Sequence, residues 1–144
     1  MRSLLDVNVL IALLDASHAF HRRAHAWWAA NARHGWASCP LVENGVARIM
    51  CHPAYSTQRQ FAVEEIVGAL AQFVAASDHK FWPDTLSLRD GDVFVVDHIH
   101  SGKKITDLYL LALATAHKAR LVTFDQGITV PAVKLASSRN LCVL

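Results

Sequence analysis

Hydrophobic positions along the chain fall into two kinds of segment. Short apolar runs bounded by polar or turn residues predict buried strands. These runs occupy residues 2–5, 36–39, 120–124 and 140–144, with a weaker one at 81–83. Longer segments with apolar residues at i, i+3 and i+4 predict amphipathic helices. They cover residues 8–16, 17–33, 41–50, 59–76 and 106–119, whereas 89–100 is ambiguous between helix and strand.

Several residues mark predicted helix boundaries. Ser17 and Thr106 are candidate N-caps, Gly35 suits the end of the second helix, and Pro40 suits the first turn of the third. The order of elements predicts one α/β domain, residues 1–144, with a central, mostly parallel sheet. Right-handed crossovers would bring the carboxyl ends of its strands to one edge. The first strand passes directly into a helix, which places Asp6 at that edge.

Composition limits the class of protein. The chain is 53% hydrophobic and 18% charged, and this apolar surplus suggests that a partner or a second copy covers part of the surface. No run approaches the roughly 18 uncharged apolar residues that a membrane span requires, and no signal-peptide pattern is present. We therefore expect a cytoplasmic protein without a membrane partner. A net charge of +2 permits nucleic-acid binding without arguing strongly for it.

Other reactive side chains predict structure rather than chemistry. The three cysteines are widely spaced and are expected to be reduced core thiols. His18, His21 and His25 have a spacing that could bind zinc, but no cysteine or acid completes a site, which favours a solvated helix face. The four tryptophans could stack on RNA bases, although core packing is the preferred interpretation. There is no glycine-rich phosphate loop and no G-x-S-x-G motif.

Four of the twelve acidic residues lie at element boundaries within apolar sequence. They are Asp6, Glu43, Asp107 and Asp125. Each alone has a structural explanation, as a helix-start carboxylate or a turn residue. Together at one sheet edge they would repel one another unless a divalent cation neutralised them. A set of oxygen ligands without cysteine or histidine suits Mg²⁺ or Mn²⁺.

These acids lie in four segments that resemble a known family. LLDVNVLIALL, LVENGVARI, ITDLYLLALA and LVTFDQGI are similar to the four acidic motifs of PIN-domain ribonucleases, and in particular of VapC-type toxins of bacterial toxin–antitoxin pairs. The resemblance implies a three-layer α/β/α fold. It implies metal ligands at Asp6, Glu43, Asp107 and Asp125, and supporting polar roles for Asn8, Thr106 and Thr123. Many members carry a further acid after the fourth; Gln126 and Gly127 stand there instead, so no fifth ligand is expected.

The resemblance also implies an activity and partners. RNA phosphodiesters would be hydrolysed by a water activated by Mg²⁺ or Mn²⁺, with single-stranded or loop RNA as the expected substrate. A cognate antitoxin and a homodimer are the implied protein partners. Arg48, Lys103 and Lys104 are candidates for RNA contacts, although solvated surface charge explains them equally well.

Two alternatives remain. Asp6-x-Asn8 after the first strand is reminiscent of phosphatases of the haloacid-dehalogenase type, but that class requires a second Asp where Asn8 stands. A PIN-like fold kept as a binding module without catalysis is the other possibility. The complete set of four acids argues against it, because an inactive site has no reason to keep carboxylates that repel one another.

Overall fold

Five parallel strands form the centre of the molecule. In the computed structural model, which describes residues 1–144, the sheet has the order β3-β2-β1-β4-β5. The strands are β1 (Ser3–Leu5), β2 (Trp36–Ser38), β3 (His79–Phe81), β4 (Arg120–Thr123) and β5 (Leu141–Val143). In the central strand, Leu4 pairs with Ala37 on one side and Leu121 on the other, and all three are fully buried. A strand covered on both faces has a continuous run of apolar residues, and for this reason β1 could be predicted from the sequence.

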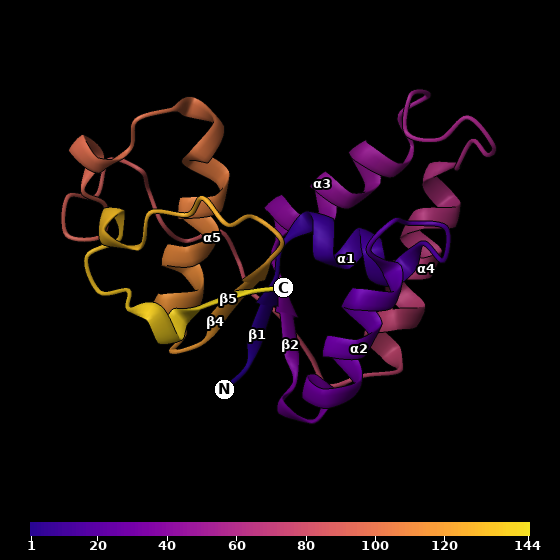
Figure 1. Ribbon diagram of the computed structural model, residues 1–144, viewed down its shortest axis with the longest axis horizontal. Coiled ribbons are helices and arrows are strands. Elements are labelled where there is room, and N and C mark those ends of the chain that lie inside the picture. The colour runs from indigo at the N-terminus through magenta and orange to yellow at the C-terminus, as the bar shows by residue number, and fades with distance from the viewer.

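Helices cover both faces of this sheet. The α-helices are α1 (Val7–Leu14), α2 (His21–Asn31), α3 (Pro40–Met50), α4 (Val63–Ala75) and α5 (Ile105–Ala116). The short 3₁₀ helices are η1 (Ala32–His34), η2 (Val96–His98), η3 (Gly102–Lys104), η4 (Val130–Ala132) and η5 (Ser138–Asn140). Helices α1 to α4 pack together on one face, and α5 covers the other (Figure 1). The expected three-layer α/β/α architecture is confirmed.

Helices α1 and α3 approach closely because Gly45 has no side chain. A Cβ atom built on Gly45 would lie 2.9 Å from Val7 Cγ2, inside van der Waals contact. This approach brings α3, with Glu43 in its first turn, against the helix that Asp6 begins. A glycine on a buried helix face is therefore a packing requirement here.

We expect Gly45→Ala to lower the free energy of unfolding by about 1–2 kcal/mol, because the added methyl must push α3 away from Val7. Gly68→Ala is the matched control. Gly68 lies in exposed α4 with nothing within 4 Å of its added Cβ, so this change should stabilise the protein by about 0.5–1 kcal/mol. Urea denaturation measures both. A Gly45→Ala protein as stable as the wild type would contradict this packing.

The fourth helix differs from its prediction at its start and in its buried face. It begins at Val63 rather than 59, where the Glu65 carboxylate accepts a hydrogen bond from the Ala62 N–H across a capping turn. Ile66 and Leu70 are buried, as the apolar spacing indicated. Val63 and Val67, from the same predicted stripe, remain 61% and 53% exposed, because α4 is an outer helix that packs on α3 through only part of its surface.

Other boundaries also differ from the prediction. Helix α5 begins at Ile105, so Thr106 lies within its first turn instead of capping it. Helix α2 begins at His21 after Phe20, and Ser17 does not cap it. Residues 89–100 form neither a long helix nor a strand, but only η2 and a bridge between Phe94 and Val133. Gly35 ends the α2–η1 segment as predicted, with φ of +73°.

Two histidines of α2 cap the C-terminal end of α1. His21 Nδ1 lies 2.7 Å from the Ala12 carbonyl oxygen and His25 Nε2 lies 3.1 Å from that of Leu13. The last carbonyls of a helix have no partner within it, and these two imidazoles satisfy them. His25 is exposed, as expected for a solvated helix face, whereas His21 is half-buried, so that interpretation is wrong for His21. One ring nitrogen of each is committed to the backbone.

The remaining structural expectations concern cysteines, tryptophans and the membrane. All three cysteines are free, and Cys39 is fully buried, which with its surroundings raises its thiol pKa to about 12. Trp36 and Trp82 are buried in the core, as expected for packing residues. None of the helices has the length and apolarity to cross a bilayer.

Candidate active site

Asp6 is the buried starting point of the site. It follows β1 directly and caps α1, because its Oδ1 accepts a hydrogen bond of 2.7 Å from the Val7 N–H. Its Oδ2 accepts a second bond of 2.7 Å from the Thr123 hydroxyl. The residue is only 6% exposed. Burial raises the pKa of Asp6, the two hydrogen bonds oppose that rise, and the charge of Asp125 adds to it.

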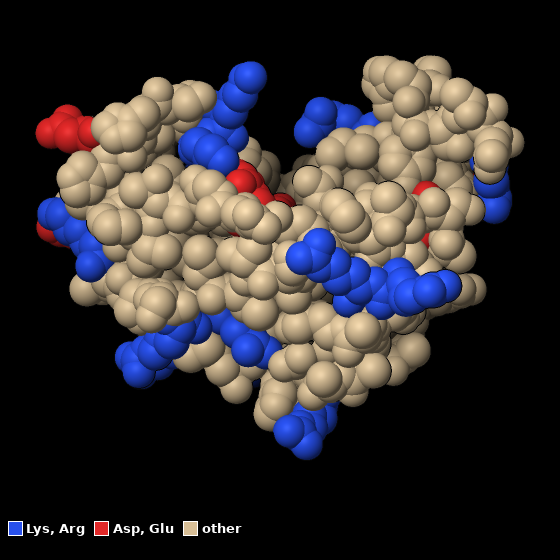
Figure 2. Space-filling view, in the orientation of Figure 1, with Lys and Arg blue, Asp and Glu red and all other residues tan.

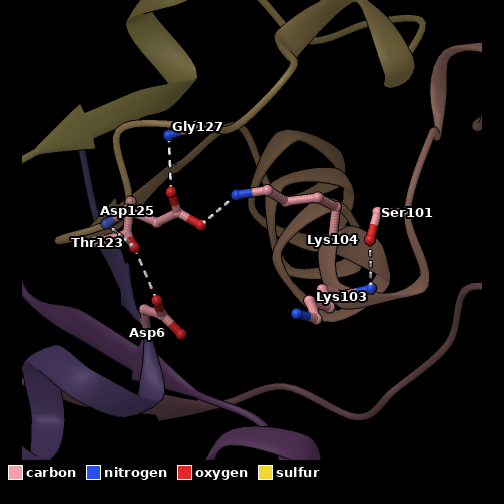
Figure 3. Close-up of polar contacts among 7 residues, drawn as sticks. All are labelled: Asp6, Ser101, Lys103, Lys104, Thr123, Asp125 and Gly127. Atoms are coloured by element: carbon pink, nitrogen blue, oxygen red, sulfur yellow. Dashed lines mark hydrogen bonds and ion pairs between the residues drawn. The ribbon is translucent and has the colours of Figure 1, made fainter.

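Thr123 connects the Asp6 carboxylate to the backbone of Asp125. Its hydroxyl donates to Asp6 and accepts a hydrogen bond of 3.0 Å from the Asp125 N–H (Figure 3). Thr123 ends β4, the parallel neighbour of β1, so the two strand ends lie at the same edge. One buried hydroxyl therefore fixes both the Asp6 side chain and the backbone of Asp125.

Asp125 carries the one ion pair of this edge. Its Oδ2 lies 2.8 Å from Lys104 Nζ, and its Oδ1 accepts a 2.7 Å bond from the Gly127 N–H. The Lys104 ammonium and the Gly127 N–H hold the pKa of Asp125 below its usual value. A Cβ on Gly127 would lie 2.8 Å from Lys104 Nζ, so the turn after Asp125 fits closely around the lysine.

Asp107 completes a group of three carboxyls. It lies in the first turn of α5 and is half-buried. Burial, followed by the negative charges of Asp6 and Asp125, raises its pKa to about 7. Asp6 and Asp125, 119 positions apart in the chain, therefore both lie within electrostatic reach of Asp107.

Glu43 lies in the first turn of α3, and its side chain bonds to a residue outside the group of aspartates. Its Oε1 accepts a hydrogen bond of 2.5 Å from the buried Ser38 hydroxyl. The same hydroxyl lies 2.7 Å from His79 Nε2, on the neighbouring strand β3. Because the Ser38 proton goes to the carboxylate, the hydroxyl oxygen accepts from the His79 N–H. The sequence offered no signal for Ser38 and His79, since neither is acidic or part of a recognisable motif.

Comparison with known proteins decides the family. The sequence profile described as PIN domain matches residues 3–134. The chain is also 44% identical to ribonuclease VapC44 of Mycobacterium tuberculosis strain H37Rv over 144 residues, which is all of both chains. This chain is a PIN-domain protein of the VapC type.

Other relatives of this VapC-type PIN domain agree. Ribonuclease VapC38 of M. tuberculosis H37Rv is 39% identical over 127 residues, 88% of this chain and 86% of the relative. Among solved structures, one chain of VapBC2 from Rickettsia felis, crystallised with a DNA fragment from their promoter, aligns with all of this chain and 98% of its own length. That alignment has a TM-score of 0.53 and 15% sequence identity, and it supports the fold alone.

The predicted supporting residues have different surroundings. Thr123 is buried and bonds to the Asp6 carboxylate and the Asp125 backbone N–H, as described above. Asn8 and Thr106 are exposed, and their side chains form no hydrogen bond within the chain. Of the three basic candidates for RNA contacts, Arg48 and Lys103 are exposed, whereas Lys104 is engaged with Asp125. Sequence reasoning missed the Lys104–Asp125 pair because the two residues are 21 positions apart.

The surface of the molecule is hollowed between two lobes. Figure 2 shows a notch between two lobes, with acidic atoms at its floor and basic atoms on both walls. Figures 1 and 2 share one orientation, in which the lobes correspond to α5 with its adjoining loops and to the α1–α4 layer. An anionic chain could approach along the basic walls, while a cation would be drawn to the floor.

The side-chain chemistry fits a hard divalent ion. As the side chains lie, no group of three or more His, Cys, Asp and Glu residues is close enough together to hold a metal ion. The donors are nevertheless all oxygens, which suit Mg²⁺ or Mn²⁺. The Lys104 ammonium already places one positive charge against Asp125, and the neighbouring negative charges contribute to the raised pKa of Asp107.

Proposed function

We propose that this VapC-type PIN domain is a Mg²⁺- or Mn²⁺-dependent endoribonuclease and the toxin of a toxin–antitoxin pair in the cytoplasm. The observation that carries the proposal is that Asp6 and Asp125 follow two adjacent parallel strands, with Asp107 of α5 within electrostatic reach of both. Relatives of 39–44% identity are named ribonucleases, which supports RNA as the substrate.

Asp6, Asp107 and Asp125 would hold the ion, with Glu43 as the fourth ligand. The bound ion would supply a water of lowered pKa and would stabilise the extra charge of the phosphodiester transition state. For Glu43 to contribute, its carboxylate must turn away from Ser38 towards the cleft. No nucleophilic side chain is required in this scheme.

The remaining groups would orient these ligands. The Val7 N–H and the Thr123 hydroxyl each hold one oxygen of Asp6, so its carboxylate cannot rotate freely. The Gly127 N–H similarly fixes Oδ1 of Asp125. Ligands held in place before binding lose less freedom on coordination, and partners of this kind are commonly worth about 10–100-fold in metal affinity or activity.

Lys104 should compete with the ion for Asp125. We expect Lys104→Met, which keeps the aliphatic stem and removes the charge, to tighten Mn²⁺ binding about fivefold at low salt. Lys103→Met is the matched control, because this neighbouring lysine is exposed and pairs with no carboxylate. Calorimetric titration without RNA measures both. If Lys104→Met bound Mn²⁺ no better than Lys103→Met, the competition would be refuted.

The proposed activity is tested by incubating the purified chain with a structured RNA. Fragments should accumulate with Mn²⁺ or Mg²⁺ and not with chelator. RNA binding without cleavage at any metal concentration would instead support a non-catalytic binding module. Hydrolysis of a small phosphate ester through a phosphorylated Asp6 would support the phosphatase reading.

A cognate antitoxin and a homodimer belong to the same proposal. Large apolar side chains remain exposed on α4 and β3, including Val63, Val67 and Phe81. An apolar surface of this kind is typical of protein contacts. Light scattering of the isolated chain, and of the chain mixed with its antitoxin, would establish each assembly.

A further inference from the structure

The α1–α2 side of the molecule carries a long segment without acids. Residues 16–42 contain three arginines, four histidines and no Asp or Glu. None of the three arginines forms a salt bridge; the ion pairs of the molecule are Arg2–Asp78, Arg59–Glu65 and Lys104–Asp125. Figure 2 shows basic atoms spread over this side of the face, below the cleft. Positive charge that is not neutralised within the protein is available to an anionic ligand.

A small aromatic platform lies at the start of this segment. Phe20 precedes α2 and is 42% exposed, and its ring centroid lies 4.8 Å from that of Phe124. The Arg23 guanidinium lies over both rings, 5.7 Å from the Phe20 centroid and 5.9 Å from the Phe124 centroid. We call these three side chains, Phe20, Arg23 and Phe124, the Phe20 platform. It combines a partly exposed aromatic ring, which the His18 ring also approaches at 5.9 Å, with an unneutralised cation.

This platform adjoins the carboxylates through the backbone. Phe124 stands between Thr123, whose hydroxyl bonds to Asp6, and Asp125. Thr123 bonds to Asp6 at the end of β4, and the next residue, Phe124, lies in the bend that follows and contacts Phe20 at the start of α2. A ligand spanning both places would run from the acidic floor onto an aromatic surface.

We propose that the Phe20 platform is a binding site for one base of single-stranded RNA, beside the sheet edge that carries Asp6 and Asp125. The base stacks on the exposed Phe20 ring, and the Arg23 guanidinium contacts the adjoining phosphate. This inference rests on the proposed function and adds a specific base-binding site for the expected single-stranded substrate. Bases within a duplex cannot reach the ring, so the site selects unpaired nucleotides.

Two substitutions of Phe20 separate stacking from simple apolar packing. Phe20→Leu keeps an apolar side chain against Phe124 and removes the π face, whereas Phe20→Trp enlarges that face. With a fluorescent single-stranded oligonucleotide in chelator, where cleavage cannot occur, we expect Phe20→Leu to weaken binding roughly tenfold. Phe20→Trp should bind at least as tightly as the wild type. Quenching of 2-aminopurine placed in the oligonucleotide should be lost in Phe20→Leu alone.

Substitution of the arginine tests the phosphate contact. We expect Arg23→Ala to lower the slope of log affinity against log salt by about one unit, since one phosphate contact is lost. Arg33→Ala is matched in charge and lies at the far end of the same segment in η1, so its salt slope should equal that of the wild type. Phe20→Leu should leave the slope unchanged.

The outcomes distinguish this site from the proposed activity. If the wild type binds RNA in a Phe20-dependent way but never cleaves it, the nuclease proposal fails and the platform stands. If Phe20→Leu and Phe20→Trp both bind RNA like the wild type, the platform is refuted, whatever the cleavage assay shows. Loss of antitoxin binding in Phe20→Leu with RNA binding intact would assign the surface to a protein partner and equally overturn the proposal.

Discussion

Asp6→Asn should reduce metal-dependent RNA cleavage at least about a hundredfold. Removing a partner that merely orients a ligand costs about 10–100-fold, and removing the ligand itself should cost no less. The amide cannot offer the ion a negative charge. Initial rates on a fluorescent RNA in Mn²⁺ measure the effect, with Asp92→Asn, an exposed acid away from the carboxylates, as the control for charge. Equal rates for Asp6→Asn and the wild type would contradict the role of this residue.

The same substitution should not destabilise the metal-free fold. Burial, with the charge of Asp125 adding to it, raises the pKa of Asp6, so its ionised form lowers the stability of the folded protein at neutral pH. An asparagine oxygen can still accept from the Val7 N–H, and Thr123 can reorient its hydroxyl. We therefore expect a free energy of unfolding equal to or above that of the wild type in chelator. Lost activity would then be a property of the site rather than of folding.

Thr123→Val should lower activity or metal affinity about 10–100-fold. Valine keeps the shape but leaves Oδ2 of Asp6 without its donor and the Asp125 N–H without its acceptor. Unsatisfied groups of this kind should also cost about 1–3 kcal/mol of stability. Thr123→Ser retains the hydroxyl and should restore most of both. Parallel cleavage and urea-denaturation measurements test the pair, and a fully active Thr123→Val protein would refute the bridging role.

Much of the fold could be predicted because buried elements have strong apolar patterns. Strands β1 and β4 are apolar runs covered on both faces, and Ile66 and Leu70 mark the buried side of α4. Edge strands and surface segments were predicted less accurately. The prediction placed β3 at 81–83, whereas it begins at His79, because its register is set by pairing with β2 and its residues are largely exposed. Residues 89–100 include apolar residues, but they form no long helix or strand.

The position of the candidate site could be predicted from the sequence, but the orientation of its side chains could not. Parallel strands bring their carboxyl ends together, so Asp6 and Asp125 could be expected at one edge. The direction of a flexible side chain depends on neighbours that are distant in the chain. The Ser38 hydroxyl that holds Glu43 and the Lys104 ammonium that meets Asp125 belong to this class of contact. The sequence around each residue does not predict these long-range contacts.

The central claim is that these carboxylates hold a divalent cation. It is tested most directly by titrating the metal-free protein with Mn²⁺ and following free Mn²⁺ by electron paramagnetic resonance, with the wild type and Asp6→Asn side by side. We predict that the wild type binds one or two ions and that Asp6→Asn binds at least about tenfold more weakly. Identical Mn²⁺ binding by the two proteins would contradict the account.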